Sequence, residues 1–144
     1  MDKNILSLDV GTVRIGIAVK LAAGTLTLLD AVPRAQNQGL LAVLKLIDEM
    51  HIDLVVAGIP LNEDNQEGAQ ALNIRQFLTR FAKRSDKPII LVDEYGSSQD
   101  AKQQLSKHEN VIATRKKGTI DSLAASNILQ AFLANRGVIG EFKQ

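Results

Sequence analysis

The feature that most constrains the fold is a strand–turn–strand pattern near the start of the chain. Residues 5–10 read Ile-Leu-Ser-Leu-Asp-Val, a Gly-Thr pair follows, and residues 13–19 are again mainly apolar. Apolar residues at almost every position predict a strand that is buried on both faces of a sheet. This strand carries one acid, Asp9, and a buried carboxylate needs a cation, a metal ion or a proton. We therefore expect Asp9 to bind a divalent metal ion together with other acids.

The rest of the pattern predicts a layered α/β fold. Short connections predict that the first three strands form an antiparallel meander, and the helices that follow predict right-handed crossovers. The result is a five-stranded mixed sheet, in the order three-two-one-four-five, with helices on both faces, which is the ribonuclease H-like arrangement. Residues 1–144 form a single domain in this interpretation, with a loosely held tail after about residue 137. The predicted strands are 4–9, 14–20, 25–29, 53–58 and 88–92, and the predicted helices are 39–50, 70–84, 100–106 and 120–135.

Composition narrows the classes of function. The formal net charge of the 144 residues is +1, so nucleic-acid binding would need a local basic patch rather than a basic chain. The chain has no cysteine, which excludes disulfides and thiolate metal sites. No apolar run reaches the roughly 20 residues that a membrane helix needs. No signal peptide is recognisable, and we expect no membrane partner.

Further acids are expected near Asp9. The first, fourth and fifth predicted strands are parallel, so their carboxyl ends share the edge where ligands usually bind. Asp93 and Glu94 follow the fifth strand, and at most one of them can face Asp9 because neighbouring strand residues alternate between faces. Asp121 begins the last helix, with apolar residues three, four, seven and eleven positions later. It therefore shares the face that packs on the sheet.

Three carboxylates at one sheet edge indicate a metal centre of a particular chemistry. Carboxylate oxygens are the ligands that hard Mg²⁺ or Mn²⁺ ions prefer. One or two such ions can activate a water molecule and stabilise the leaving oxygen of a phosphodiester. The sequence therefore predicts hydrolysis of phosphodiester bonds without a covalent enzyme intermediate.

Several segments together resemble the YqgF/RuvX family of ribonuclease H-fold, Holliday-junction-resolvase-like proteins. They span nearly the whole chain in the order of the family. The matching segments are 8–12 (Leu-Asp-Val-Gly-Thr), 14–16 (Arg-Ile-Gly), 58–62 (Gly-Ile-Pro-Leu-Asn), 67–68 (Glu-Gly), 93–94 (Asp-Glu), and Lys117 with residues 120–121, 124–125 and 128–130.

This resemblance implies a bacterial cytoplasmic nuclease that matures the 5′ end of 16S ribosomal RNA, with branched DNA as another substrate. It implies that Asp9, Glu94 and Asp121 are the metal ligands and catalytic residues, which selects Glu94 over Asp93. Structured RNA or branched DNA would be the partner, and the protein would be a monomer or a homodimer.

Candidate substrate contacts surround these acids. The Thr12 hydroxyl suits a cap on its own turn better than a phosphate contact. The loop that starts at Asn62 is either a plain turn or a segment that orders on nucleic acid. A short basic run is more often a solvated loop, but the run 115–117 lies just ahead of Asp121, and this position makes contact with phosphate an equal expectation. We expect the basic face of helix 70–84 to be solvated. The candidates are Thr12, Arg14, Asn62, Tyr95, Arg115, Lys116 and Lys117.

Two departures from the family pattern keep alternatives open. Val13 and Tyr95 stand where the family tends to have positive charge, although Tyr95 could stack on a base. One alternative is an inactive nucleic-acid-binding member of the same fold. A more distant alternative is the actin-like and sugar-kinase group, which uses a similar Asp-x-Gly-Thr hairpin for nucleotide phosphate but needs two such domains.

Overall fold

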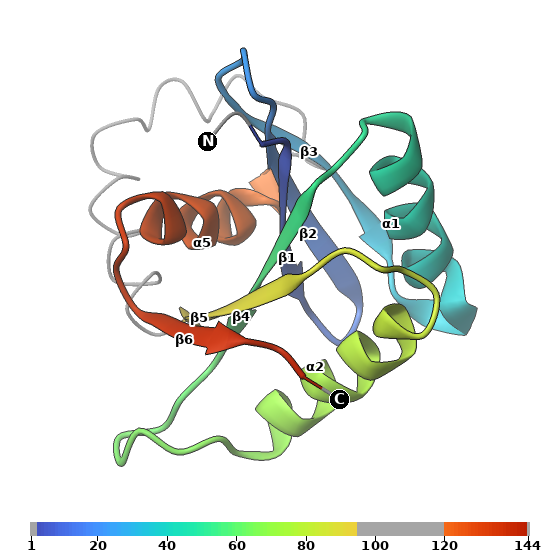
Figure 1. Ribbon diagram of the computed structural model, residues 1–144. Helices are drawn as coiled ribbons and strands as arrows, with labels where there is room; N and C mark the ends of the chain where they lie inside the picture. Colours follow the sequence, from blue (N-terminus) through green and yellow to red (C-terminus); the bar gives the residue numbers. More distant parts are fainter. Residues whose placement is uncertain (1–2, 95–119, 144) are drawn as a thin grey trace.

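The computed structural model describes residues 3–94 and 120–143. Within them, the strands form one mixed sheet of six, in the order β3-β2-β1-β4-β5-β6 (Figure 1). The order of the first five strands is the one that the sequence predicts. The strands are β1 (Ile5–Val10), β2 (Arg14–Lys20), β3 (Leu26–Pro33), β4 (Leu54–Ile59), β5 (Ile89–Asp93) and β6 (Val138–Glu141).

The register of the sheet places three strand ends together. β1 is antiparallel to β2, with Asp9 opposite Gly16. β1 is parallel to β4, and β4 is parallel to β5. The carboxyl ends of β1, β4 and β5 therefore meet at one edge of the sheet, where open α/β sheets usually bind ligands.

Helices cover both faces, as predicted. α1 (Gln38–Glu49), which follows the short turn η1 (Ala35–Asn37), and α2 (Ala69–Ala82) lie on one face, and α5 (Leu123–Leu133) lies on the other (Figure 1). Buried side chains divide accordingly. Leu8 packs with Phe77 in the core under α1 and α2, whereas Val56 packs with Ile128 in the core under α5.

The end of the chain differs from the sequence prediction. Instead of a loose tail, residues Val138–Glu141 form β6, which pairs antiparallel with β5. The Phe142 side chain is 9% exposed and belongs to the core under α1 and α2. The prediction of five strands is therefore short by one. The physical reason is that the outer edge of β5 would otherwise leave backbone groups unpaired.

Among the predicted helices, the last is present with shifted bounds and another lies outside the described residues. The last helix begins at Leu123 rather than at residue 120. The predicted helix 100–106 lies outside the described residues. None of the helices in the described parts of the chain combines the length and apolar character needed to cross a membrane.

Candidate functional site

Asp9 projects toward the α5 face of the sheet. Its neighbours Leu8 and Val10 belong to the core under α1 and α2. Alternate residues of a strand share a face, so Ser7 and Asp9 project the other way. The Ser7 hydroxyl confirms this, since it donates a hydrogen bond of 2.8 Å to the carbonyl oxygen of Ala125 in α5.

Glu94 projects to the same face as Asp9. Val92, two residues earlier, is part of the core under α5. A Cβ atom placed on Gly58 of β4 would lie 3.4 Å from the Glu94 Cβ, so the absence of a side chain at Gly58 leaves room there. Asp93 projects to the opposite face, and its backbone N–H donates to the Gly137 carbonyl at 2.7 Å. Of the two acids at the end of β5, only Glu94 is placed to meet Asp9.

The carboxyl groups of Asp9 and Glu94 lie close enough to interact directly. Burial, the hydrogen bond with Asp9 and repulsion by the Asp9 and Asp93 charges together raise the pKa of Glu94 to about 8, burial being the largest cause. A raised pKa in one member of a carboxyl pair means that the pair retains a proton at neutral pH. The same pair attracts a divalent cation, which can replace that proton.

Asp121 lies beside this pair but has a different contact. Its backbone oxygen would be only 2.7 Å from a Cβ on Gly16, the residue that pairs with Asp9 across the sheet. Its carboxylate forms an ion pair with Arg14, with 3.8 Å between Nε and Oδ2. Among the described residues, no three acids or histidines gather closely enough to form a metal cluster. The structure thus joins Asp9 with Glu94 and places Asp121 next to them, paired with a cation.

Ser122 fixes the start of α5 to the sheet. The β2–β3 ladder is irregular between Ile15 and Ile17. The buried Ser122 hydroxyl fills this gap: it donates to the Leu29 carbonyl at 2.6 Å and accepts from the Ile17 N–H at 2.9 Å. These two hydrogen bonds, one to each strand, hold Ser122 in place and so position the adjacent Asp121. Neither the role of Ser122 nor the Arg14–Asp121 pair could be predicted, because both depend on residues about a hundred positions apart.

Replacing Ser122 with Ala should therefore destabilise the fold by about 1–3 kcal/mol, because a buried N–H and a partly buried carbonyl lose their partner. Urea unfolding measures this. Ser126→Ala is the matched control, since the Ser126 side chain is also buried and makes no hydrogen bond within the described residues. Equal losses in the two variants would contradict the anchoring role of Ser122.

The turn after β1 is closed by the backbone. The Gly11 N–H donates to the Arg14 carbonyl at 2.9 Å. Thr12 is exposed, and no hydrogen bond of its hydroxyl is seen within residues 3–94 and 120–143, so its predicted role as a cap on the turn stays a prediction. Val13 is 67% exposed beside it.

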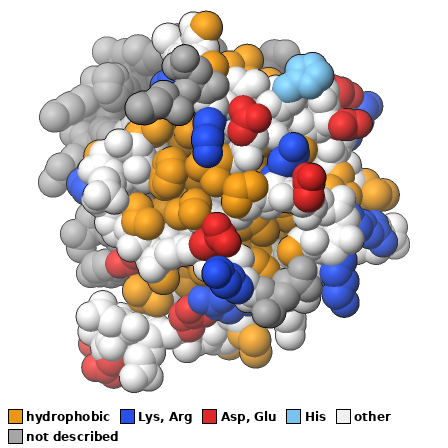
Figure 2. Space-filling model, in the orientation of Figure 1, with side chains coloured by type: hydrophobic (Ala, Val, Ile, Leu, Met, Phe, Trp, Pro, Cys, Tyr) orange, Lys and Arg blue, Asp and Glu red, His pale blue; other side chains and the backbone are white. Residues whose placement is uncertain are grey.

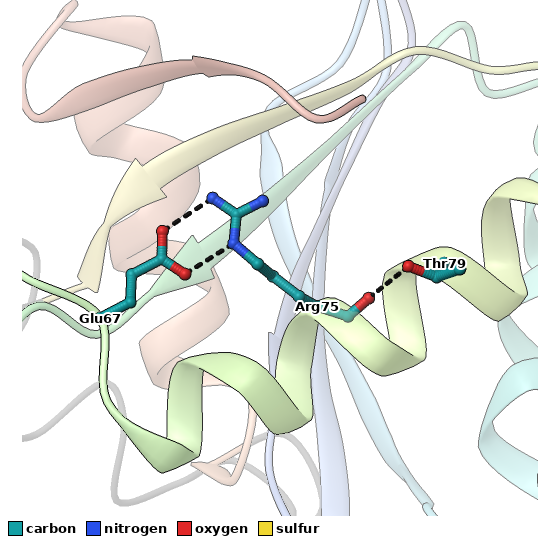
Figure 3. Close-up of polar contacts among 3 residues, drawn as sticks. All are labelled: Glu67, Arg75 and Thr79. Atoms are coloured by element: carbon teal, nitrogen blue, oxygen red, sulfur yellow. Dashed lines mark hydrogen bonds and ion pairs between the residues drawn. The ribbon is translucent and has the colours of Figure 1, made fainter. Parts of the chain in front are cut away.

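The loop after β4 is ordered by its own side chains. The Asn62 Oδ1 atom accepts hydrogen bonds from the N–H groups of Asp64 and Gln66, at 2.9 and 3.0 Å. Glu67 then forms a two-pronged ion pair with Arg75 of α2, with N–O distances of 2.6 and 2.7 Å (Figure 3). The hydrogen bonds from Arg75 lower the pKa of Glu67. Asn62 thus has a structural role in shaping this loop, and contact with substrate remains a prediction for it.

Comparison with known proteins identifies the family. The RuvX family, described as Holliday junction resolvase, matches residues 3–135. The chain belongs to the RuvX family. Relatives from Picosynechococcus sp. and Roseiflexus sp., each named "Putative pre-16S rRNA nuclease", are 36% and 34% identical to it over 133 residues. The matches cover 91% and 90% of this chain and 92% of each relative.

A solved structure confirms the predicted ribonuclease H-like fold. RuvC of T. thermophilus in complex with a Holliday junction substrate superposes with a TM-score of 0.59 and 15% sequence identity. The match covers 97% of this chain and 99% of that one. The remaining predicted substrate contacts of this RuvX-family chain, Tyr95, Arg115, Lys116 and Lys117, lie outside the described residues.

Proposed function

We propose that this protein is a metal-dependent nuclease that hydrolyses phosphodiester bonds, with Asp9, Glu94 and Asp121 as its catalytic acids. The observation that carries the proposal is the close pair of Asp9 and Glu94 carboxyl groups at the shared carboxyl edge of β1, β4 and β5. Two acids forced together at a ligand-binding edge are costly to the fold, which is typical of a functional site.

The donor set fits Mg²⁺ or Mn²⁺, as one ion or two. Carboxylate oxygens of Asp9 and Glu94 would bind such an ion, after the pair loses the proton it shares in the metal-free state. When bound, the metal supplies positive charge that acidifies a water molecule and stabilises the phosphoryl transition state. Asp121 would become a third ligand once its carboxylate leaves Arg14.

Arg14 has a second role in this proposal. Its side chain is 58% exposed, and its ion pair with Asp121 is long, at 3.8 Å. Exposed ion pairs of this kind contribute little free energy, so Arg14 can leave Asp121 for another partner at a small cost in free energy. Contact with a substrate phosphate would release the Asp121 carboxylate toward the metal.

The relatives named for pre-16S rRNA and the family description support two substrates. Structured RNA at the 5′ end of pre-16S ribosomal RNA is the first, and branched DNA is the second. Ribosomal RNA maturation would place the protein in the cytoplasm.

A test follows from the metal requirement. We expect cleavage of a pre-16S rRNA fragment in Mg²⁺ or Mn²⁺ and none in a chelator such as EDTA, with activity restored by excess metal. A four-way DNA junction run in parallel decides between the substrates. Cleavage that continues in the chelator would contradict the metal mechanism.

One observation favours a second candidate, a nucleic-acid-binding protein without activity. Asp121 is paired with Arg14 rather than gathered with Asp9 and Glu94 in the described part of the chain. If RNA binds but is not cleaved under any metal condition, this second function replaces the first.

A further inference from the structure

A polar hollow lies on the α2 side of the molecule, away from the acids. Its volume is about 400 Å³, and no carboxylate lines it. Figure 2 shows Lys and Arg side chains at the lower right of the molecule, where α1 begins and α2 passes below it. The lining residues are Arg34, Asn73, Gln76, Thr79 and Arg80.

Arg34 is held firmly in this hollow. Its backbone N–H donates to the Val13 carbonyl at 2.9 Å, and its Nη1 donates to the Gly11 carbonyl at 2.7 Å. Its guanidinium also stacks over the Phe77 ring, 5.2 Å from the ring centre. A guanidinium fixed in this way loses little entropy when it binds an anion.

Arg80 brings a second positive charge to the same place. Burial and the nearby charge of Arg80 both lower the pKa of Arg34. Neither arginine forms an ion pair with an acid among the described residues, whereas Arg14 and Arg75 both do. Two cations side by side without a carboxylate are unfavourable unless an anion joins them, and paired arginines match the oxygens of phosphate.

The hollow lies near the edge of the sheet that carries Asp9 and Glu94, but on the opposite face of the sheet. Gly11, which accepts the Arg34 hydrogen bond, follows Asp9 by two residues. Asp9 projects toward α5, whereas Arg34 and Phe77 lie on the α2 side. Only the turn between β1 and β2 separates the hollow from Asp9.

We propose that Arg34 and Arg80 bind a backbone phosphate of the nucleic-acid substrate, at a position distinct from the bond that is cleaved. The identity of the substrate rests on the proposed function. A polymer suits the hollow better than a free anion, because Asn73, Gln76 and Arg80 are exposed and a single small anion would be weakly held there. A nucleic-acid strand that is already bound at Asp9 and Glu94 can also contact Arg34 and Arg80 without a further loss of translational freedom.

Arg80→Gln tests the proposal, with Arg84→Gln as the matched control. Arg84 is an exposed arginine just beyond α2, where it lines a different hollow. Binding of a pre-16S rRNA fragment and of a four-way DNA junction is measured in EDTA by fluorescence anisotropy at several salt concentrations. We expect Arg80→Gln to weaken binding roughly three- to tenfold and to reduce the salt slope by about 1. Arg84→Gln should remain close to the native protein in both quantities.

Three results would overturn the proposal. The first is an unchanged affinity and salt slope in Arg80→Gln. The second is an equal loss in Arg84→Gln, which would indicate an effect of net charge. The third is binding of inorganic phosphate in the hollow, followed by NMR, while nucleic-acid affinity does not depend on Arg80. Loss of binding in Arg80→Gln supports the proposal even if no cleavage is ever detected, so its failure can be told apart from failure of the nuclease function.

Discussion

Replacing Asp9 with Asn is expected to reduce cleavage by about 10³-fold, which corresponds to about 4 kcal/mol in activation free energy. The substitution keeps the size of the side chain but removes the negative charge that a metal ion needs. It also disrupts the carboxyl pair with Glu94. Stabilisation by a bound metal is worth several kcal/mol in the transition state, so losing it accounts for an effect of this size.

Single-turnover cleavage of the RNA fragment measures this loss, and anisotropy reports binding of the same RNA. Asp48→Asn is the matched control, because Asp48 is exposed in α1, on the opposite face of the sheet from Asp9. We expect the control to cleave normally and Asp9→Asn to bind RNA without cutting it. If Asp9→Asn retained more than about a tenth of native activity, Asp9 would not be a metal ligand.

The metal-free protein is expected to lose stability as the pH rises from about 4.5 to about 8. The Glu94 carboxyl has a pKa of about 8 in the folded protein, against an ordinary value of 4.5, mainly because it is buried. Between these values the folded state binds more protons than the unfolded state, so the free energy of unfolding falls as the pH increases. The loss should be on the order of 3 kcal/mol by pH 7.

Urea unfolding in EDTA between pH 5 and pH 8.5 measures this decline. Glu94→Gln should flatten it, because glutamine has no proton to lose, and Glu63→Gln in the exposed loop after β4 should leave it unchanged. Excess Mg²⁺ should stabilise the native protein at pH 8 but not Glu94→Gln. Parallel pH profiles for native protein and Glu94→Gln would show that the buried pair does not control stability.

Alternation along strands made much of the candidate site predictable. Because Leu8 and Val10 are buried under α1 and α2, Asp9 has to project the other way, and the same alternation separates Asp93 from Glu94. The resemblance selected Glu94, and the structure places Glu94 against Asp9. The metal-binding roles themselves remain predictions.

Contacts between distant residues were not predictable. Nothing local to Arg34 indicates that it reaches Gly11 and Phe77, since this contact depends on how the β1–β2 turn and α2 pack. β6 was missed because Val138–Glu141 is short and includes Gly140, whose φ of 147° is unusual for a strand residue. Its pairing follows from the open edge of β5 rather than from its own sequence.

The Ser122 anchor has a consequence for how this protein can change. The start of α5 takes its position from β2 and β3, through the hydrogen bonds of Ser122 to Ile17 and Leu29. A change in β3 that moves the Leu29 carbonyl would therefore also move Ser122 and the neighbouring Asp121. Substitutions in β3 could thus alter the position of a candidate catalytic acid without touching that acid.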